Sequence, residues 1–222
     1  MSKKSLESLQ GQLGYIFQDQ TLLAQAFRHS SVTKSPQKSY ERLEFLGDRI
    51  LGLCVADLLY TAYPTDKEGE LARRHSALVC EEVLATIARD LSLEKLIQGE
   101  TKDFSEKRPS VLADVIEALL AVVYLENGLK AAQEIITKFW TPLISQMTEA
   151  PKDPKSALQE WAHRHNKKTP LYDLKKRSGP DHDPLFTVQV SLGQSLQATA
   201  QGASLKQAEK KAAVALLKDL QK

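Results

Sequence analysis

Three carboxylates lie close together in the stretch YERLEFLGDR, residues 40–49. On a helix with 100° per residue, Glu41, Glu44 and Asp48 fall within roughly 60° of one another, and the aliphatic residues of the segment fall on the opposite side. This pattern is typical of a helix with a solvated acidic face. Phe45 weakens that interpretation, because its aromatic ring lies on the acidic side, where a large apolar group indicates a partner.

A second pair of acids lies in SVLADVIEALLAVVYL, residues 110–125, which is apolar nearly all round and so predicts a buried helix. Asp114 and Glu117 are its only charged residues, and their i, i+3 spacing places the β-carbons about 5–6 Å apart. Two adjacent carboxylates in apolar surroundings need a cation, a shared proton or access to water, because an uncompensated buried charge is very costly.

A divalent metal ion would compensate these charges, and ligands that are all oxygens favour Mg²⁺, with Mn²⁺ as a plausible substitute. If the two helices are neighbours, one pocket would hold four carboxylates, those of Glu44, Asp48, Asp114 and Glu117. A salt bridge to a distant arginine is the alternative. A metal in such a pocket lowers the pKa of a water molecule and neutralises charge on phosphate oxygens, which is the chemistry of phosphodiester hydrolysis.

The charge of the chain is divided unevenly along its length. Residues 1–150 carry 17 Lys and Arg against 21 Asp and Glu, a net −4, whereas residues 151–222 carry 13 against 7, a net +6. The opposite signs indicate two modules with different partners. A basic module of this size is typical of a nucleic-acid binder, and a bland excess of surface lysine is the alternative.

The composition is that of an ordinary globular protein, with 42% hydrophobic and 26% charged residues. The first ten residues lack the apolar core of a signal peptide, and no apolar run is long enough to span a membrane. Cys54 and Cys80 lie in apolar surroundings without CxxC spacing, which favours buried, reduced thiols. We therefore expect a cytoplasmic protein without a membrane partner or a small-molecule cofactor.

Hydrophobic periodicity predicts an all-α first module over residues 1–150 and a linker over 151–154, where Pro151 and Pro154 interrupt two helical patterns. The helices expected in the first module cover about 5–12, 20–28, 40–62, 67–74, 77–90, 93–97, 110–126 and 129–147.

The second module, residues 155–222, predicts the order α-β-β-β-α. Asp153 can cap a helix over 155–166. The stretch LFTVQVSL, residues 185–192, alternates cleanly as a strand, with PLYDLKKR and SLQATA as neighbouring strands. Ser204 and Gln207 form a capping-box pattern that opens a last helix over 205–221. The fold class is thus an all-α domain followed by a small α+β domain.

ERLEFLGDRIL and SVLADVIEALLAVVYLENG resemble the signature and the second acidic motif of the ribonuclease III family. The stretch LGYIFQDQTLLAQAFRHSS, residues 13–31, is similar to the N-terminal segment of that family. Residues 154–222, with DPKSALQEWAH, GPDHDPLFTVQV and GASLKQAEKKAA, resemble a double-stranded RNA-binding domain. The resemblance covers nearly the whole chain, and its motifs are specific.

The resemblance implies roles for the acids and for the stray aromatic residue. Metal-binding positions would be Glu44, Asp48, Asp114 and Glu117, of which Asp48 and Glu117 are those usually called catalytic. Glu41 would be an accessory acid of the signature. Glu68 would be another, although Glu70 lies close by and competes for that role. Phe45 matches the aromatic that enters a socket on a partner subunit, which implies a homodimer.

In the second module the resemblance implies that the first helix and the loop after the first strand contact successive minor grooves of duplex RNA. The matching residues are Gln159, Glu160 and His182, for which simple exposure to solvent is the alternative. Lys206 and Lys210 are spaced i, i+4 at the start of the last helix, where the helix dipole also favours phosphate.

The implied activity is endonucleolytic hydrolysis of double-stranded RNA that leaves 5′-phosphate and 3′-hydroxyl ends with short 3′ overhangs, with ribosomal RNA precursors and other structured transcripts as substrates. The chain departs from the family pattern at Tyr40, where asparagine is common, at Leu205, where lysine is common, and in the loop over 100–110. A protein that binds duplex RNA without cutting it, and a phosphohydrolase of small molecules, are the competing hypotheses.

Overall fold

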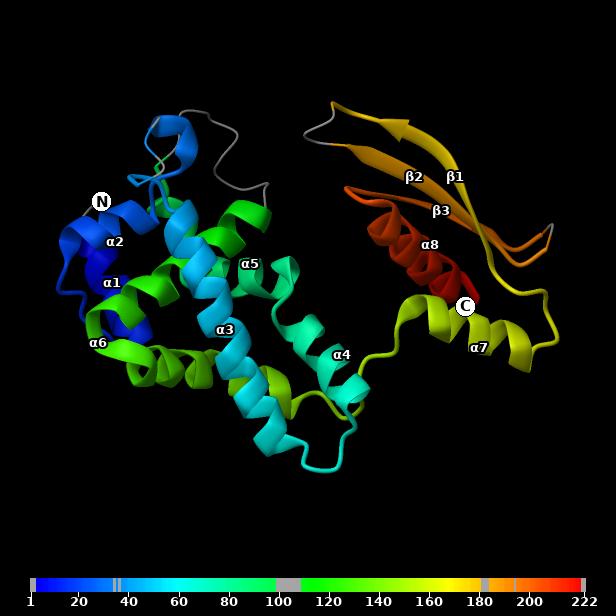
Figure 1. The fold of residues 1–222 in the computed structure, drawn as a ribbon, viewed down its shortest axis with the longest axis horizontal. Helices are drawn as coiled ribbons and strands as arrows, with labels where there is room; N and C mark the ends of the chain where they lie inside the picture. The colour runs from blue at the N-terminus through cyan, green and yellow to red at the C-terminus, as the bar shows by residue number, and fades with distance from the viewer. Residues whose placement is uncertain are drawn as a thin grey trace. The chain divides into compact units, whose positions relative to one another are not determined.

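The computed structural model describes residues 3–33, 35, 37–98, 109–180, 184–193 and 195–220. The chain divides into two compact units, residues 1–150 and 151–222, which are considered separately (Figure 1). None of the described helices is both long and apolar enough to cross a membrane. The atypical loop expected over 100–110 falls largely outside the described residues, as does His182.

The first unit is helical, as predicted. Its helices are α1 (Lys3–Leu13), α2 (Gln20–Ala26), α3 (Glu41–Ala62), α4 (Glu68–Leu78), α5 (Glu81–Asp90) and α6 (Pro109–Ser145), with 3-10 turns η1 (Ser30–Val32) and η2 (Leu93–Lys95). The segment predicted as a helix over 93–97 is thus only a 3-10 turn, because Ser92 before it takes a left-handed conformation (φ 56°). Gly128 (φ 75°, ψ −176°) interrupts α6 where two predicted helices meet.

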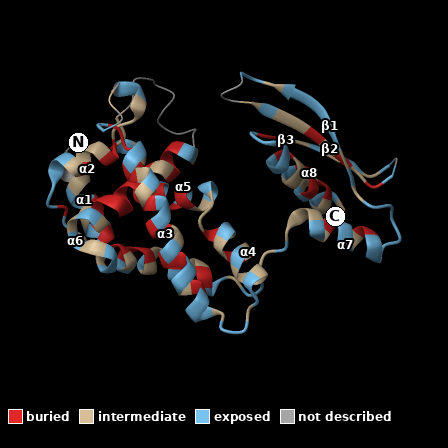
Figure 2. Ribbon diagram, viewed as in Figure 1, coloured by how far each residue is buried: buried red, intermediate tan, exposed pale blue. Residues whose placement is uncertain are grey.

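The core of this unit lies between α3 and α6, which cross in the middle of the helical unit and are covered by α5 and α2 (Figure 1). Buried side chains line the inner faces of these helices, and the outer face of α3 is exposed (Figure 2). Trp140 on α6 is buried and donates its indole N–H to the carbonyl of Leu78, 2.9 Å away. Arg74, also buried, donates to Asp66 and to the carbonyl of Met147, which ties α4 to the end of the unit.

The second unit has the predicted α-β-β-β-α order, which confirms the fold class. Its elements are α7 (Pro154–Arg164), β1 (Leu171–Ser178), β2 (Leu185–Ser191), β3 (Gln197–Gly202) and α8 (Leu205–Leu220). The strands form an antiparallel sheet in the order β1-β2-β3, and both helices cover one face of it (Figure 1). Val188 and Val190 point from β2 into the core beneath α8.

Asp153 caps α7 as expected: its carboxylate accepts hydrogen bonds from the backbone N–H groups of Lys155 and Ser156, and Pro154 occupies the first turn. At the other end of the unit, a β-carbon at Gly202 would lie 2.6 Å from the backbone nitrogen of Ala208. Only glycine therefore allows β3 to end so close to the first turn of α8. These two features fix the start of both helices, which carry the residues predicted to contact RNA.

Candidate active site and RNA-binding surfaces

The two acid-bearing helices touch at Gly47, in the middle of the LGD sequence of α3. A β-carbon at this position would lie 1.8 Å from the carbonyl oxygen of Glu117 on α6, far closer than real contacts allow. Glycine inside a helix costs about 1 kcal/mol relative to alanine, so its presence here has a packing reason. Gly47 was not among the residues predicted from the sequence, although an isolated glycine in a strongly helical pattern indicates a packing constraint.

This close approach brings together acids from two distant segments. One carboxylate oxygen from each of Glu44, Asp114 and Glu117 lies within 4.8 Å of the others. All three side chains are half-buried, and every other residue of α6 from Val111 to Val123 is buried. The acids are therefore the only break in an apolar helix face, as the composition of that segment predicted.

Burial and mutual repulsion raise the pKa of each of these carboxyl groups. Burial is the main cause for Glu117, whose pKa is raised to about 8 with further contributions from Asp48, Asp114 and Glu44. The pKa of Glu44 is raised to about 7, again mainly by burial and then by Asp114. The pKa of Asp114 is raised to about 6 by burial, although a hydrogen bond from Tyr40 lowers it. The ionised group is thus electrostatically unfavourable by itself.

The donor set fits a hard divalent cation. It consists of carboxylate oxygens only, from three residues whose repulsion a dication would relieve. Within the described ranges, no Lys or Arg forms an ion pair with Glu44, Asp114 or Glu117, although the charge of Arg49 lowers the pKa of Glu117.

Asp48, the fourth predicted ligand, lies outside this group of three. Its side chain is 51% exposed and forms an ion pair with Arg49, at 2.8 Å from Oδ2 to the guanidinium. Its charge nevertheless raises the pKa values of Glu44 and Glu117, so it lies near them. The structure thus brings three of the four predicted ligands together, and the carboxylate of Asp48 is paired with Arg49 instead.

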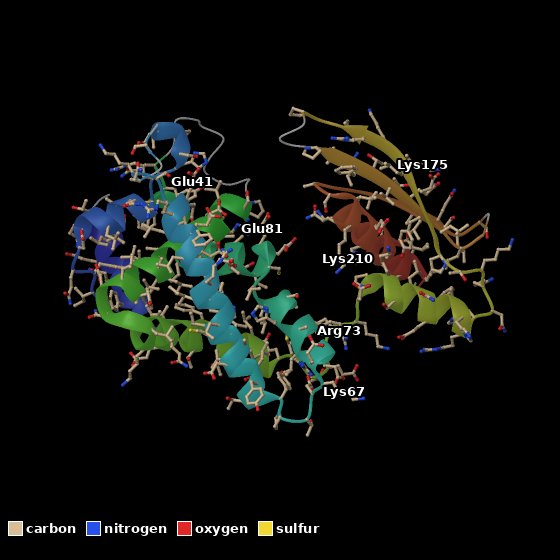
Figure 3. The ribbon with its side chains drawn as sticks, in the orientation of Figure 1. Glu41, Lys67, Arg73, Glu81, Lys175 and Lys210 are labelled. Carbon is tan, nitrogen blue, oxygen red and sulfur yellow. The ribbon has the colours of Figure 1, made fainter. Side chains whose placement is uncertain are left out.

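The two predicted accessory acids differ in their surroundings. Glu41, labelled in Figure 3 at the N-terminal end of α3, accepts a hydrogen bond from Ser39 at 3.3 Å, and its charge raises the pKa values of Glu44 and Asp114. Glu68 is exposed in the first turn of α4. Glu70, its competitor, accepts a hydrogen bond from the N–H of Lys67 and so serves as a helix cap.

One face of α3 carries large apolar side chains that are exposed: Phe45 at 63%, Leu53 at 58% and Tyr60 at 75%. We call these three residues the α3 stripe, because at 100° per residue they fall within roughly 80° of one another. The guanidinium of Arg49 lies 4.0 Å from the centre of the Phe45 ring. Phe45 is therefore not packed into its own core, in agreement with its position on the acidic side of the helix.

A hollow lies beside the α3 stripe, between α3 and α4. Its floor and walls combine apolar residues with a few polar ones: Leu53, Ala56, Asp57, Leu59, Tyr60, Glu68, Leu71, Ala72 and His75. His75 is held there by a 2.9 Å hydrogen bond to the carbonyl of Gly52. Contiguous apolar surface of this kind is typical of a protein–protein contact.

On the second unit, the outer side of α7 is exposed and slightly hollowed. Gln159 and Glu160 line this hollow together with Ser156, His163 and Arg164. Glu160 also forms an exposed ion pair with Lys152, at 3.1 Å. His163 and Arg164, which lie one turn further along the same face, were not among the residues predicted to contact RNA.

The start of α8 carries the predicted pair of lysines. Lys206 is exposed, and Lys210, labelled in Figure 3, forms a 3.0 Å ion pair with Asp153. Lys155 on α7 pairs in the same way with Glu209, at 2.6 Å. Ala208 and Ala212 point inward. His182, predicted to contact RNA from the loop between β1 and β2, lies outside the described residues, so its position stays a prediction.

Comparison with known proteins agrees with this geometry. The family model described as Ribonuclease-III-like matches residues 19–143, and the model of the double-stranded RNA binding motif matches residues 154–220. A protein named Ribonuclease 3 from Mesorhizobium japonicum is 45% identical over 208 residues, which are 92% of this chain and 94% of that one. Ribonuclease 3 from Zymomonas mobilis is 43% identical over 208 residues, 92% of this chain and 83% of that protein.

Among solved structures, the nuclease domain of ribonuclease III from Campylobacter jejuni matches 66% of this chain and 99% of its own, with 35% identity and a TM-score of 0.61. A second structure of that domain, whose description refers to a region involved in dimer formation, matches with 36% identity and a TM-score of 0.57, over 61% of this chain and 99% of that one.

The fold and the paired acidic helices define a nuclease joined to a module for duplex RNA. The chain belongs to the ribonuclease III family, and it is an endoribonuclease that acts on double-stranded RNA.

Proposed function

We propose that the chain hydrolyses phosphodiester bonds in double-stranded RNA with the help of bound Mg²⁺, for which Mn²⁺ can substitute. The convergence of Glu44, Asp114 and Glu117 at the contact between α3 and α6 supports this proposal most strongly. These three residues and Asp48 would hold the ion. Once bound, a divalent cation supplies an acidified water molecule and neutralises charge on the phosphate.

The acids of the first unit would have different roles in the reaction. Asp48 and Glu117 take the catalytic role, with Glu41 and Glu68 as accessory acids. The exposure of Asp48 favours this role, because its carboxylate can exchange Arg49 for another positive partner by rotating its side chain. Between Glu68 and Glu70, we propose Glu68 as the accessory acid, because Glu70 is occupied as a helix cap.

The second unit would hold the duplex through Gln159, Glu160 and His182 in the minor grooves and through Lys206 and Lys210 at phosphates. The four of these residues that the structure describes are exposed or half-exposed, on the outer side of α7 and at the start of α8. The domain type supports recognition of the shape and 2′-hydroxyl groups of RNA rather than its base sequence.

The proposal includes a homodimer. The α3 stripe is exposed and the hollow between α3 and α4 lies next to it, so a two-fold axis across α3 would let Phe45 of each copy enter the hollow of the other. Two active sites in one dimer would cut both strands, which leaves 5′-phosphate and 3′-hydroxyl ends with a short 3′ overhang. Precursors of ribosomal RNA and other structured transcripts in the cytoplasm are the proposed substrates. The unpaired state of both cysteines is usual for a reducing compartment.

A cleavage assay tests the reaction. A duplex RNA with a different label on each strand is incubated with the full-length protein in Mg²⁺ or in EDTA, beside the same strands unpaired. We expect cutting of the duplex only, in Mg²⁺ only, with products offset on the two strands. Extension by poly(A) polymerase reports 3′-hydroxyl ends, and digestion by an exonuclease that requires 5′-phosphate reports the other end. Duplex that is bound but intact in Mg²⁺ would favour the competing hypothesis of a binding protein.

A further inference from the structure

Tyr40, the residue directly before α3, is held firmly by its backbone. Its N–H donates to the carbonyl of Arg28 at 3.0 Å, and its own carbonyl accepts from the N–H of Glu44 at 2.9 Å. The side chain is 3% exposed. The direction of this side chain is therefore set both by the first turn of α3 and by the segment around Arg28.

The ring of Tyr40 is also supported from one side. The imidazole of His29 meets it edge-on, with centroids 5.6 Å apart and an interplanar angle of 63°. His29 is itself fixed, because its Nδ1 accepts from the N–H of Ser31 at 3.0 Å and its backbone N–H donates to Gln98 at 3.1 Å. The ring is thus locked by packing that does not depend on its hydroxyl group.

The hydroxyl of Tyr40 donates a hydrogen bond to Oδ2 of Asp114, at 3.1 Å. An ionised carboxylate can only accept a hydrogen bond, so the tyrosine hydroxyl is the donor in this pair. A donor on one oxygen fixes the rotation of a carboxylate, and the group keeps acceptor capacity for a cation. Asp114 is the one member of the group of three for which such a donor is found among the described residues.

We propose that Tyr40 is a positioning residue that orients Asp114 for binding of the divalent cation; this inference rests on the proposed function. Partners of this kind, one step removed from the metal, typically account for 10–100-fold in metal affinity, because they set the orientation of a ligand before the ion arrives. A purely structural role, as a link between α3 and α6, would instead change the stability of the fold and leave metal affinity unaltered.

The test is the affinity of the metal-free, full-length protein for Mn²⁺ alone, measured from the free-ion signal in electron paramagnetic resonance. Tyr40→Phe keeps the ring and removes the hydroxyl. Tyr15→Phe is the matched control, because the Tyr15 hydroxyl also donates to a carboxylate, that of Glu126 at 2.7 Å, in the same unit but outside the group of three. Thermal unfolding in EDTA reports the structural effect of each variant.

We expect Tyr40→Phe to bind Mn²⁺ roughly tenfold more weakly than the wild type, and Tyr15→Phe to bind like the wild type. A Tyr40→Phe protein that binds Mn²⁺ within twofold of the wild type would overturn the positioning role. A wild-type protein that binds no Mn²⁺ would overturn the metal site itself, and the two failures are therefore distinct.

A second measurement is made on the wild-type protein, and the Tyr40→Phe variant serves only to assign one resonance. The chain has six tyrosines, and in wild-type protein labelled with ¹³C at tyrosine Cζ each gives its own resonance. If the Tyr40 hydroxyl bonds to a metal ligand, titration with Mg²⁺ should shift one resonance, and Tyr40→Phe identifies it by its loss. A titration in which all six resonances stay in place would contradict the proposal.

Discussion

The first unit half-buries three carboxylates side by side on α3 and α6, whereas the second unit displays lysines at its surface and pairs several of them with nearby acids. Like charges in a shielded position are costly, and the fold tolerates them at a site that a cation can complete. Exposed ion pairs, in contrast, contribute little to stability and are easily exchanged for phosphates. The placement of charge thus separates the part of the chain that does chemistry from the part that holds the substrate.

The largest change in cleavage rate is expected from removal of a negative charge from the carboxylates of the first unit. Glu117→Gln removes one negative charge from the group of three and keeps the size of the side chain. We expect the cleavage rate to fall by more than the roughly 10–100-fold typical of changes beyond the ligands, with affinity for duplex RNA nearly unchanged. Asp48→Asn should behave alike, and Glu134→Gln, exposed on the same helix, is the control. Full activity in either site variant would refute the assignment of that residue.

Phe45→Ala tests the proposed contact between two copies. Burial of an aromatic ring at the centre of an interface is often worth 2 kcal/mol or more, so the dissociation constant of the dimer should rise about thirtyfold. Sedimentation velocity over a range of concentrations measures this change. Ile16→Ala, which removes another exposed apolar side chain in the same unit but away from α3, should leave the dimer intact. An unaltered dimer in Phe45→Ala would mean that the α3 stripe is not the interface.

Removing the two lysines at the start of α8 tests whether the second unit holds the RNA. Lys206→Ala with Lys210→Ala should weaken binding of duplex RNA roughly tenfold at low salt and reduce the salt slope by about 2, since each phosphate contact contributes about one unit. Cleavage at saturating RNA should be unchanged. The double variant is compared with Lys218→Ala, at the far end of the same helix. If both proteins show the same salt slope as the wild type, the lysines do not contact phosphate.

The smallest effect is a shift in stability with pH. Because the folded-state pKa values of Glu44, Asp114 and Glu117 are raised, the folded state binds more protons than the unfolded state between about pH 4 and 8, and stability must fall as the pH rises. The charges of Glu41, Asp48 and Glu81 add to this effect, whereas the charge of Arg49 opposes it at Glu117. In EDTA the unfolding temperature should drop by several degrees from pH 5 to pH 8, since about 1 kcal/mol corresponds to roughly 2–4 °C for a chain of this size.

Saturating Mg²⁺ should flatten this dependence, because the ion replaces the protons as the compensating charge. Glu117→Gln should also flatten it in part. An unfolding temperature that rises with pH in EDTA would show that these carboxyl groups are not destabilised in the folded protein.

Sequence periodicity was sufficient to find the buried acids and the exposed aromatic. Asp114 and Glu117 were the only charges on an apolar segment, and Phe45 lay on the wrong side of its helix. The order of elements in the second unit followed from alternation in one strand and from two helix caps. Both kinds of signal are local, since the helix and strand periods can be counted along the chain.

Contacts between segments far apart in the sequence could not be predicted from local patterns. The hydrogen bond from Tyr40 to Asp114 joins residues 74 positions apart, and a tyrosine before a helix carries no local sign of it. Asp48 was expected among the ligands, but the structure pairs its carboxylate with Arg49. The spacing of residues along the sequence does not determine the side-chain rotamer that makes this pair. The boundary between the helices predicted over 67–74 and 77–90 was likewise misplaced, since α4 runs to Leu78 and α5 begins only at Glu81.

Gly47 has a consequence for how relatives of this chain are judged. A single added methyl group at this position would collide with the backbone at Glu117 and force α3 and α6 apart, while every carboxylate remained in the sequence. A homologue can therefore lose its catalytic centre without losing one acid. An inventory of acidic residues alone would mistake such a protein for a working nuclease, and the glycine between the two acids of the signature helix should be inspected with them.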